Sequence, residues 1–360
     1  MIERATNSAD PENNPRNTPS TRYRRVQMRY HNNPMNPRHK QRSQGVALIT
    51  AMLIVALASI AAVAVVSRQQ FDIRRSANLI NGDQAYQFAL GVESWAKQLL
   101  VRDLTKGATD DLKEDWAKQL PPLSVEGGQV AGHIEDLQSR YNLNNLVDNA
   151  GVINNNEVER FKNLLRSLNI PDNLAYAVAD WIDTDINPDI NGGAEDTVYT
   201  GLQPAYRTAN TLMRSVSELR LVDGITPKFY AQLEPLVCAL PAVTKINVNT
   251  ATAEVLVTLS SALSMSAAQL LVDARKTKPF ADTAAFESAL TSIGGLTAND
   301  VTAIKNQGGW AVSSSYFLVT ADTLFGKGRV HLYSELKRAT SGQPGTASQA
   351  SVIYRVQGVL

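Results

Sequence analysis

The chain is poor in cysteine and histidine, and it carries none of the common catalytic motifs. Cys238 is the only cysteine in 360 residues, so no intramolecular disulfide can form, and its aliphatic neighbours favour a buried structural thiol. Only His133 and His331 follow residue 45, and they lie far apart in the sequence. No Gly-x-Ser-x-Gly, His-Glu-x-x-His or phosphate-loop motif occurs. We therefore expect a protein that is not an enzyme.

Most of the chain has no excess of positive charge. Residues 1–45 hold nine Arg and Lys against three Asp and Glu, a surplus of +6, so residues 46–360 carry −5 of a total of +1. Binding to nucleic-acid phosphates needs a basic surface. The acidic balance after residue 45 argues against that class of function.

One long stretch, residues 46–66, lacks any charged residue. As a helix with a rise of about 1.5 Å per residue, it would span about 31 Å, the thickness of a bilayer core. Arg38, Lys40 and Arg42 precede it, and basic residues tend to stay in the cytoplasm. We predict one membrane-spanning helix, with the residues that follow it on the far side.

The leader before this stretch differs from a secretory signal, because the small residue Gly45 precedes the apolar run. It resembles a type IV prepilin-type leader, which implies cleavage by prepilin peptidase between Gly45 and Val46 and methylation of the new N-terminus. The usual Glu at the fifth mature position is replaced by Thr50. An ordinary signal anchor is the alternative. The leader is long and has a disordered composition, so translation could start at Met1, Met28 or Met35.

The remaining chain alternates between helical and strand patterns. An apolar stripe predicts that the first helix continues beyond the membrane, and residues 129–137 predict a strand. From 157 to 307 the pattern is mostly helical, including a helix over 211–219, and many segments follow good N-cap residues. From 316 the period changes to two, with a hairpin at 326–328 and a last strand over 351–360. The stripe comprises Ala85, Phe88, Ala89, Val92, Trp95, Ala96 and Leu99.

These patterns predict an α+β protein in which strand segments lie on both sides of a helical block. We expect a leader at 1–45, a transmembrane helix at 46–66, a small antiparallel-sheet α+β domain from 67–140 and 310–360, and a large inserted all-α domain at 141–309. A long N-terminal helix, half in the membrane and half on a globular head, is the plan of a pilin. The alternative is an anchor followed by an unrelated helix.

Several segments together resemble the general secretion pathway protein K family, the minor pseudopilins of the type II secretion system. They are the Gly45 cleavage site, the missing Glu at Thr50, and the stretches 134–147, 180–199 and 245–256. The resemblance covers residues 43–360. It implies an inner-membrane pseudopilin with a periplasmic head, forming a tip complex with pseudopilins I and J, and with H, above a shaft of pseudopilin G.

The acidic segment after residue 182 places oxygen-bearing side chains at every second position, as a calcium loop does at its positions 1, 3, 5 and 7. The family resemblance also implies a calcium-binding loop here. It is not an EF-hand, because Pro188 stiffens its middle and Ala194 stands at position 12. A solvated acidic loop is the alternative. The predicted ligands are Asp183, Asp185, Glu195 and Asp196, with Asn187 and Asp189 as weaker candidates.

Residues 245–256 also look like the start of a helix-hairpin-helix unit of the DNA-uptake type, with 219–236 as a degenerate partner unit. DNA-binding versions have a Gly-x-Gly hairpin, whereas residues 263–267 contain no glycine. Our leading hypothesis is therefore a non-enzymatic pseudopilin without nucleic-acid partners. A membrane-anchored DNA-binding receptor and a periplasmic hydrolase are the alternatives.

Overall fold

The computed structural model describes residues 44–119, 121–339 and 349–358. Its described residues divide into two units, the first ending at Ser67 and the second beginning at Arg68. Residues 1–43 of the predicted leader, which covers 1–45, lie outside the described part of the chain, so of the cleavage prediction only Gly45 and Val46 can be placed. Both lie in the first turn of the long helix α1, Gln44–Asp103.

The first unit contains the apolar part of α1. An 18-residue window of this helix reaches a mean hydropathy of 2.7, and no residue of that window is buried, so α1 is long and apolar enough to cross a membrane. The few hydroxyls in this part bond to the helix itself. Thr50 Oγ1 donates to the carbonyl oxygens of Val46 and Ala47 at 3.0 Å, and Ser59 Oγ donates to that of Val55 at 2.8 Å. Such back-bonding leaves no free donor on the apolar surface.

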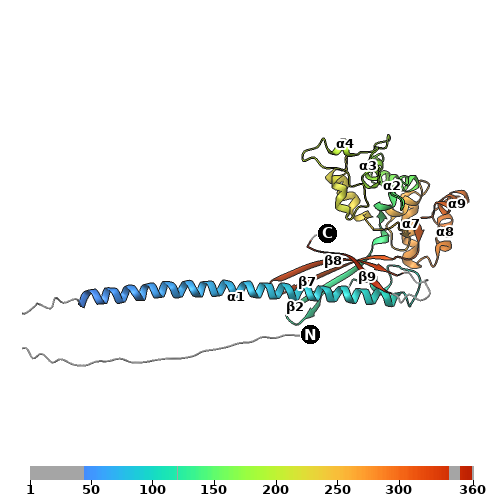
Figure 1. Cartoon of the computed structure of the whole chain (residues 1–360). Coiled ribbons are helices and arrows are strands. Elements are labelled where there is room, and N and C mark those ends of the chain that lie inside the picture. Colours follow the sequence, from blue (N-terminus) through green and yellow to red (C-terminus); the bar gives the residue numbers. More distant parts are fainter. Residues whose placement is uncertain (1–43, 120, 340–348, 359–360) are drawn as a thin grey trace, which may run out of the picture. The chain divides into compact units, whose positions relative to one another are not determined.

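The second unit holds a five-stranded antiparallel sheet in the order β1-β2-β7-β8-β9 (Figure 1). The predicted strands and the hairpin are confirmed, and β1 is an additional short edge strand. Gly326 turns the hairpin at a φ of +53°, a conformation that glycine adopts without strain. The strands are β1 Leu123–Val125, β2 Gly128–Asp136, β7 Tyr316–Phe325, β8 Gly328–Arg338 and β9 Ala350–Gln357.

The last third of α1 packs against one face of this sheet through small side chains. Ala85, Ala89 and Ala96 are completely buried against strand residues such as Phe317 and Ala321. Alanine allows the helix axis to approach the sheet closely, because no side chain beyond Cβ has to be accommodated. This contact, together with the continuation of α1 beyond its apolar segment, agrees with the predicted long helix.

Two members of the predicted apolar stripe are not part of this core. Phe88 is 40% exposed and Trp95 is 45% exposed, so these two positions of the stripe are not buried with the others. The buried face of α1 is narrower than the stripe, because the alanines hold the helix so close that the neighbouring positions at the edge of the contact point outward. The Phe88 ring stacks on Phe325 with ring centroids 4.5 Å apart, which fixes its position at that edge.

Between β2 and β7 the chain forms a helical region around the largest hydrophobic core. Its helices are α2 Asn155–Ser167, α3 Leu174–Ile182, α4 Asp196–Tyr199, α5 Pro227–Leu233, α6 Ala253–Leu256, α7 Met265–Thr277, α8 Thr283–Ser292 and α9 Ala298–Gln307. Side-chain oxygens of Asn154, Thr226, Thr252, Ser264, Asp282 and Thr297 accept backbone N–H groups at their N-termini.

The prediction of a helix over residues 211–219 is wrong. In this segment the structure has only the 3-10 helix η4, Val216–Leu221, which opens with a capping box formed by Ser215 and Glu218. The other 3-10 helices are η1 Asp115–Ala117, η2 Leu137–Ser139, η3 Leu143–Leu146, η5 Glu234–Leu236 and η6 Val257–Leu259.

Two short parallel strand pairs, which the sequence did not predict, divide the helical region into two halves. β3 (Tyr141–Asn142) pairs with β4 (Val237–Cys238), and β5 (Ile246–Asn247) pairs with β6 (Trp310–Ala311). Each half therefore begins and ends with one member of a strand pair. The structure is α+β, as predicted, but Arg68–Leu360 forms one compact unit, so the boundaries proposed for an inserted domain at 141–309 stay a prediction.

The two halves begin with the same asparagine arrangement. The side-chain oxygens of Asn142 and Asn247 accept the backbone N–H two residues later, at 3.2 and 3.0 Å. The following asparagine then binds both backbone groups of one distant residue: Asn144 binds those of Met213 and Asn249 binds those of Phe280, all at 2.8–2.9 Å. Because these amides are buried and paired with backbone groups, both segments serve the fold.

Candidate metal centre

The acidic loop begins where α3 ends. This helix is almost entirely buried, and Asp183 is its C-cap residue, with its N–H bonded to the carbonyl of Ala179 at 2.9 Å. The loop then runs through Asp185 to Glu195, the N-cap residue of α4. Its course is fixed by local bonds, such as that from the Asn187 N–H to the Asp185 carboxylate at 2.7 Å. The segment is thus a loop between helices, as the sequence predicted.

Three of the predicted ligands come together in this loop. Carboxylate oxygens of Asp183, Asp185 and Glu195 lie within 4.8 Å of one another. Asp183 is 2% exposed and Glu195 is fully buried, and one oxygen of each accepts no hydrogen bond from the described residues. A buried carboxylate oxygen without a donor is unfavourable. A cation placed among these oxygens would satisfy them.

Of the other three predicted ligands, Asp189 and Asp196 are not part of this cluster, and Asn187 contacts one of its members. Asp196 accepts hydrogen bonds from the N–H and hydroxyl of Thr208 at 3.1 and 3.0 Å and lies 3.4 Å from Arg207 Nη1. Asn187 donates its amide to Asp185 at 3.1 Å. Asp189 accepts from the backbone and side chain of Asn191, both at 2.8 Å. These side chains satisfy one another and shape the loop.

Sequence reasoning missed Asp180, which is fully buried one turn before Asp183. Its Oδ2 accepts the Asp189 N–H at 3.0 Å, whereas its Oδ1 has no partner among the described residues. The spacing of three residues between two acidic residues at the end of a helix was the available signal. Because Asp180 lies in the predicted helix before the acidic loop, it was not considered as a ligand.

Burial and mutual repulsion disfavour the charged forms of these carboxyl groups. Burial is the main cause that raises the pKa of Asp183 to about 6, and the charges of Asp185 and Glu195 add to it. Burial likewise raises the pKa of Asp180 to about 7, with Asp183 and Glu195 as like-charged neighbours. The pKa of Glu195 is also raised, mainly by burial, although Thr208 donates a hydrogen bond to it. The site therefore has a local excess of negative charge.

The donor set fits a hard cation such as Ca²⁺, which prefers six to eight oxygen ligands from carboxylates, amides, carbonyls and water. The loop also needs glycine to fold tightly here. A Cβ at Gly193 would lie 2.0 Å from Asp180 Oδ2, and Gly192 has a φ of +128°. Asp183, Asp185 and Glu195 would hold such an ion, and Asp180 lies beside them.

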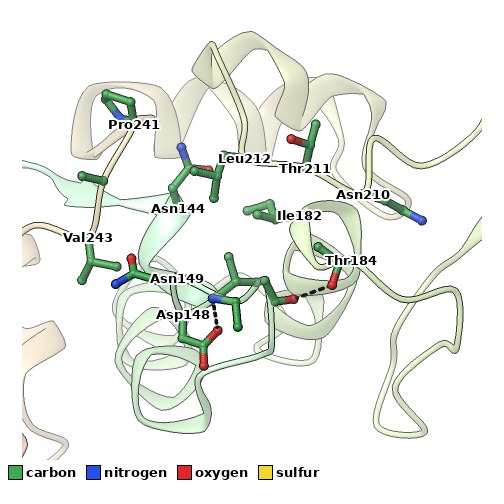
Figure 2. Close-up of a pocket in the computed structure, with 14 residues that line it drawn as sticks. Asn144, Asp148, Asn149, Ile182, Thr184, Asn210, Thr211, Leu212, Pro241 and Val243 are labelled. Carbon is green, nitrogen blue, oxygen red and sulfur yellow. Dashed lines mark hydrogen bonds between the residues drawn. The ribbon is translucent and has the colours of Figure 1, made fainter.

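A cavity of about 370 Å³ lies next to this loop (Figure 2). It is lined by Thr184 and Asn210 on the loop side and by Asp148 and Asn149 on the opposite side. The Thr184 N–H and hydroxyl donate to the carbonyl of Gly151 at 3.1 and 3.3 Å, which ties the loop to the segment after η3. The cavity is lined by both polar and apolar residues, which indicates no particular ligand.

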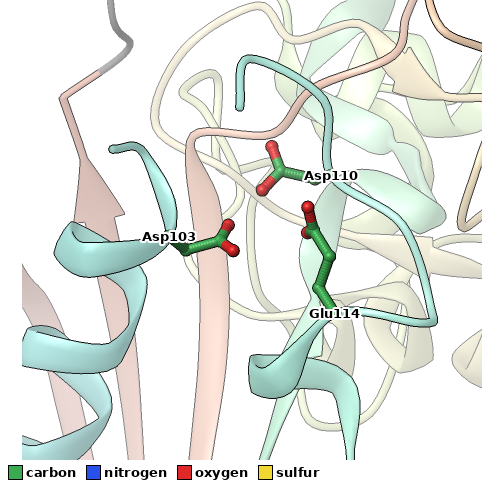
Figure 3. Close-up of side chains that lie close together, drawn as sticks. All are labelled: Asp103, Asp110 and Glu114. Carbon is green, nitrogen blue, oxygen red and sulfur yellow. The ribbon is translucent and has the colours of Figure 1, made fainter. Parts of the chain in front are cut away.

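A second acidic cluster lies at the end of α1, formed by Asp103, Asp110 and Glu114 (Figure 3). Here the positive charge is supplied by the protein. The buried guanidinium of Arg338 donates to Asp103 at 3.1 Å and also to Asp110, and it bonds the carbonyls of Leu100 and Ser314. Asp103 and Asp110 thus belong to a buried ion-pair network and already have a cation.

Glu114 is the member of this cluster that Arg338 does not contact in the structure. It accepts the Trp116 indole N–H at 2.6 Å, and burial is the main cause that raises its pKa to about 7. The charges of Asp103 and Asp110 raise it further. The folded protein therefore keeps a proton on Glu114 at pH values where the unfolded chain has lost it.

The fold and the loop together define a class of protein: a helix able to anchor in a membrane, which continues into an α+β head with a helical region and an acidic loop. The comparisons with known proteins identify the family. Family models described as "Type II secretion system (T2SS), protein K" match residues 139–242 and 246–305. The chain belongs to the type II secretion system protein K family of minor pseudopilins.

Curated relatives support this placement over most of the chain. Type II secretion system protein K of Pseudomonas aeruginosa is 37% identical over 310 residues, covering 83% of this chain and 90% of the relative. The protein of Klebsiella pneumoniae is 34% identical over 314 residues, covering 83% and 93%. In a crystal structure of the GspK-GspI-GspJ complex from enterotoxigenic Escherichia coli, one chain matches with a TM-score of 0.67. That match has 24% identity and covers 79% of this chain and 100% of the other, so it shows the fold.

The raised pKa of Glu114 predicts a pH effect on stability. Because the unfolded carboxyl ionises near pH 4.5 and the folded one near 7, the free energy of unfolding falls as the pH rises between these values. Glu114→Gln should leave stability almost unchanged at pH 5 and increase it by about 1 kcal/mol at pH 8, since partial access to water screens the charge. Denaturant unfolding at both pH values would measure this.

Glu159→Gln, at an exposed carboxyl on α2 paired with Lys162, is the control for this experiment and should have the same small effect at both pH values. If Glu114→Gln also changes stability equally at pH 5 and pH 8, the assignment of the raised pKa to Glu114 is wrong.

Proposed function

We propose that this chain is the tip subunit of a periplasmic pseudopilus and supports export of folded proteins across the outer membrane. The 37% identity to a protein K over most of the chain is the observation that carries this proposal. The proposed location is the inner membrane, crossed once by α1, with the head in the periplasm. The role is structural, and the proposal includes no enzymatic activity.

The solved relative was crystallised with GspI and GspJ. By analogy, pseudopilins I and J are the proposed direct partners of this chain, pseudopilin H is a further partner, and a shaft of pseudopilin G lies beneath them. Prepilin peptidase is the proposed processing enzyme.

Thr50 supports a position at the end of the fibre. In the pilins that this leader resembles, Glu at the fifth mature position pairs with the N-terminal ammonium of an adjacent subunit. An unpaired carboxylate in the bilayer core is unfavourable by several kcal/mol. A subunit with no neighbour above it has no ammonium to neutralise, and the Thr50 hydroxyl bonds to its own helix instead.

Labelling of isolated fibres tests the tip position directly. Gold particles directed at the head of this chain should lie at one end of each fibre, and Thr50→Glu should not improve assembly. A label distributed along the whole shaft would refute the tip assignment. The same label on pseudopilin G is the control, because a shaft subunit should be marked along the entire length.

Processing is expected between Gly45 and Val46, because the small residue separates a basic leader from the apolar run. N-terminal sequencing of protein extracted from the membrane should begin at Val46, and mass spectrometry should detect one added methyl group. An uncut leader, or a mature end beyond Val66, would contradict the prepilin assignment.

We also propose that the acidic loop binds one structural Ca²⁺ through Asp183, Asp185 and Glu195. The support is the pair of buried oxygens without donors on Asp183 and Glu195, which a cation coordinated by the cluster would satisfy together. Binding to the folded state would offset the repulsion among these carboxylates. The loop would then be held against α3 and α4 by the ion.

Thermal unfolding with calcium and with a chelator should therefore differ. An ion present at a hundredfold excess over its Kd adds about 2.7 kcal/mol to the stability of the folded state. The double substitution Asp183→Asn with Asp185→Asn should remove most of this difference, whereas Glu159→Gln, an exposed carboxylate outside the loop, should preserve it. Identical unfolding curves with calcium and chelator would leave only a solvated acidic loop.

A further inference from the structure

The last strand of the sheet, β9, leaves one edge of the sheet open. The strand order ends at β9, so in the described part of the chain no strand pairs with its outer edge. None of its eight residues is buried, whereas buried residues alternate along its neighbour β8. β9 contains no proline or lysine, which commonly protect free edges, and its pairing with β8 has one bulge, at the Glu335–Leu336 step. With respect to the described residues, this edge can pair with another chain.

Beside this edge lies a groove of about 70 Å³ between the sheet and the first half of the helical region. Glu335 of β8 and Tyr354 of β9, which are register partners, form its sheet side. Residues 214–217 and 237–240 form much of the opposite side. Sites for small molecules usually have a volume of about 300–1,000 Å³. The groove is too small for such a ligand, but it can hold the end of one long side chain.

Glu335 places a carboxyl group without a partner at this groove. The adjacent β8 residues face α1, since Ser334 donates to Glu93 and Leu336 packs in the core, so Glu335 points to the opposite face of the sheet. Burial alone raises the pKa of the Glu335 carboxyl to about 7, and no described donor or cation lowers it. A half-buried carboxylate in this state is unfavourable, so a partner that supplies a charged donor would stabilise it.

The two arginines that line the groove do not supply this donor. Arg140 donates to Glu135 at 2.5 Å, so its guanidinium is already paired. Arg214 stands on the helical side of the groove, and among the described residues it forms no ion pair with Glu335. The charge that would complete the groove therefore has to come from outside the described chain.

A contact on the same face of the sheet shows how a basic side chain can lie there. Lys337 and Tyr316 are register partners on β8 and β7, and Lys337 Nζ lies 5.7 Å from the centroid of the Tyr316 ring. Tyr354 is 45% exposed and offers an equivalent ring beside Glu335. A lysine or arginine on a strand next to β9 could cross this ring, because cations bind aromatic faces at about 6 Å or less.

We propose that a β-strand of another protein pairs with the outer edge of β9, and that a lysine or arginine of this strand crosses Tyr354 and binds the Glu335 carboxylate. An extended segment supplies the backbone groups that an open edge needs, whereas a helix would leave them unpaired. A second copy of β9 would bring no free basic residue, since Arg355 binds Glu93 on the other face. This inference goes beyond the proposed function and does not depend on it.

Photo-crosslinking of the full-length chain in the bacterium that produces it tests the strand. The probe is p-benzoylphenylalanine in place of Ser351 or Val356, whose register partners Lys337 and Tyr333 share the face of the groove. Because these partners are four residues apart, the two crosslinks should fall in one segment of one protein, about four residues apart. The control probe replaces Leu324, which is 43% exposed near the hairpin at the far end of the same face.

Variants of Glu335 test the basic side chain. Glu335→Lys and Glu335→Gln should each lower the yield of the adduct about tenfold, as the loss of one charged hydrogen bond does. Glu126→Lys, at an exposed carboxyl in the turn between β1 and β2, should leave the yield unchanged. Replacing the lysine or arginine of the crosslinked segment with glutamate should restore the yield of Glu335→Lys. Because Glu335→Gln keeps the size of the side chain, it separates the loss of charge from a loss of folding.

Three results would overturn the inference. They are a yield from positions 351 and 356 no higher than that from position 324, crosslinks that fall in separate segments of the partner, and a yield that Glu335→Gln leaves unchanged. The proposed function would stand in each case, because neither the fibre position nor the partners proposed above enter this test.

Discussion

The structure depends on a buried polar junction where α1, the sheet and the helical region meet. Arg338 at the end of β8 bonds Asp103 at the end of α1 and Asp110 in the following segment. Nearby, the fully enclosed carboxylate of Asp136 at the end of β2 accepts hydrogen bonds from Asn247, Thr250 and Ser314 at 2.6–3.1 Å. A buried charge that loses its partner costs several kcal/mol. These bonds therefore fix where each segment can begin and end, although such networks add less net stability than their number suggests.

This junction, together with the alanine contact of α1 on the sheet, determines which side of α1 is buried and which side is exposed. Arg338 holds the last turn, and Ala85, Ala89 and Ala96 hold the preceding turns against the strands. Further hydrogen bonds hold the helix as well: the Glu93 carboxylate accepts from Arg355 of β9 and from Ser334 of β8 at 2.7–2.8 Å. With the rotation of α1 fixed in this way, Phe88 and Trp95 have to point away from the core. The side of α1 that stays exposed thus follows from how the helix is held inside the subunit.

The sequence predicted features that depend on local period and turn chemistry, such as the β7–β8 hairpin at Gly326 and the loop between α3 and α4. It did not predict what depends on distance in space. The helical stripe included Phe88 and Trp95, because period alone cannot tell how wide the buried face is. Asp180 was not among the predicted ligands, since nothing local shows that its Oδ1 has no donor. Each strand in the pairs β3–β4 and β5–β6 is only two residues long, which is too short to show a periodic pattern in the sequence.

The likeness of residues 245–256 to a DNA-binding helical hairpin has a structural explanation. Asn247 and Asn249 are 0% and 2% exposed, and both amides bind groups inside the protein, including the Asp136 carboxylate and the backbone of Phe280. Asn142 and Asn144 repeat this pattern in the first half of the helical region. Two segments with the same inward bonding indicate that the motif builds a turn between a short strand and a helix. The asparagines are committed to this turn, so the motif by itself gives no reason to assign a nucleic-acid ligand.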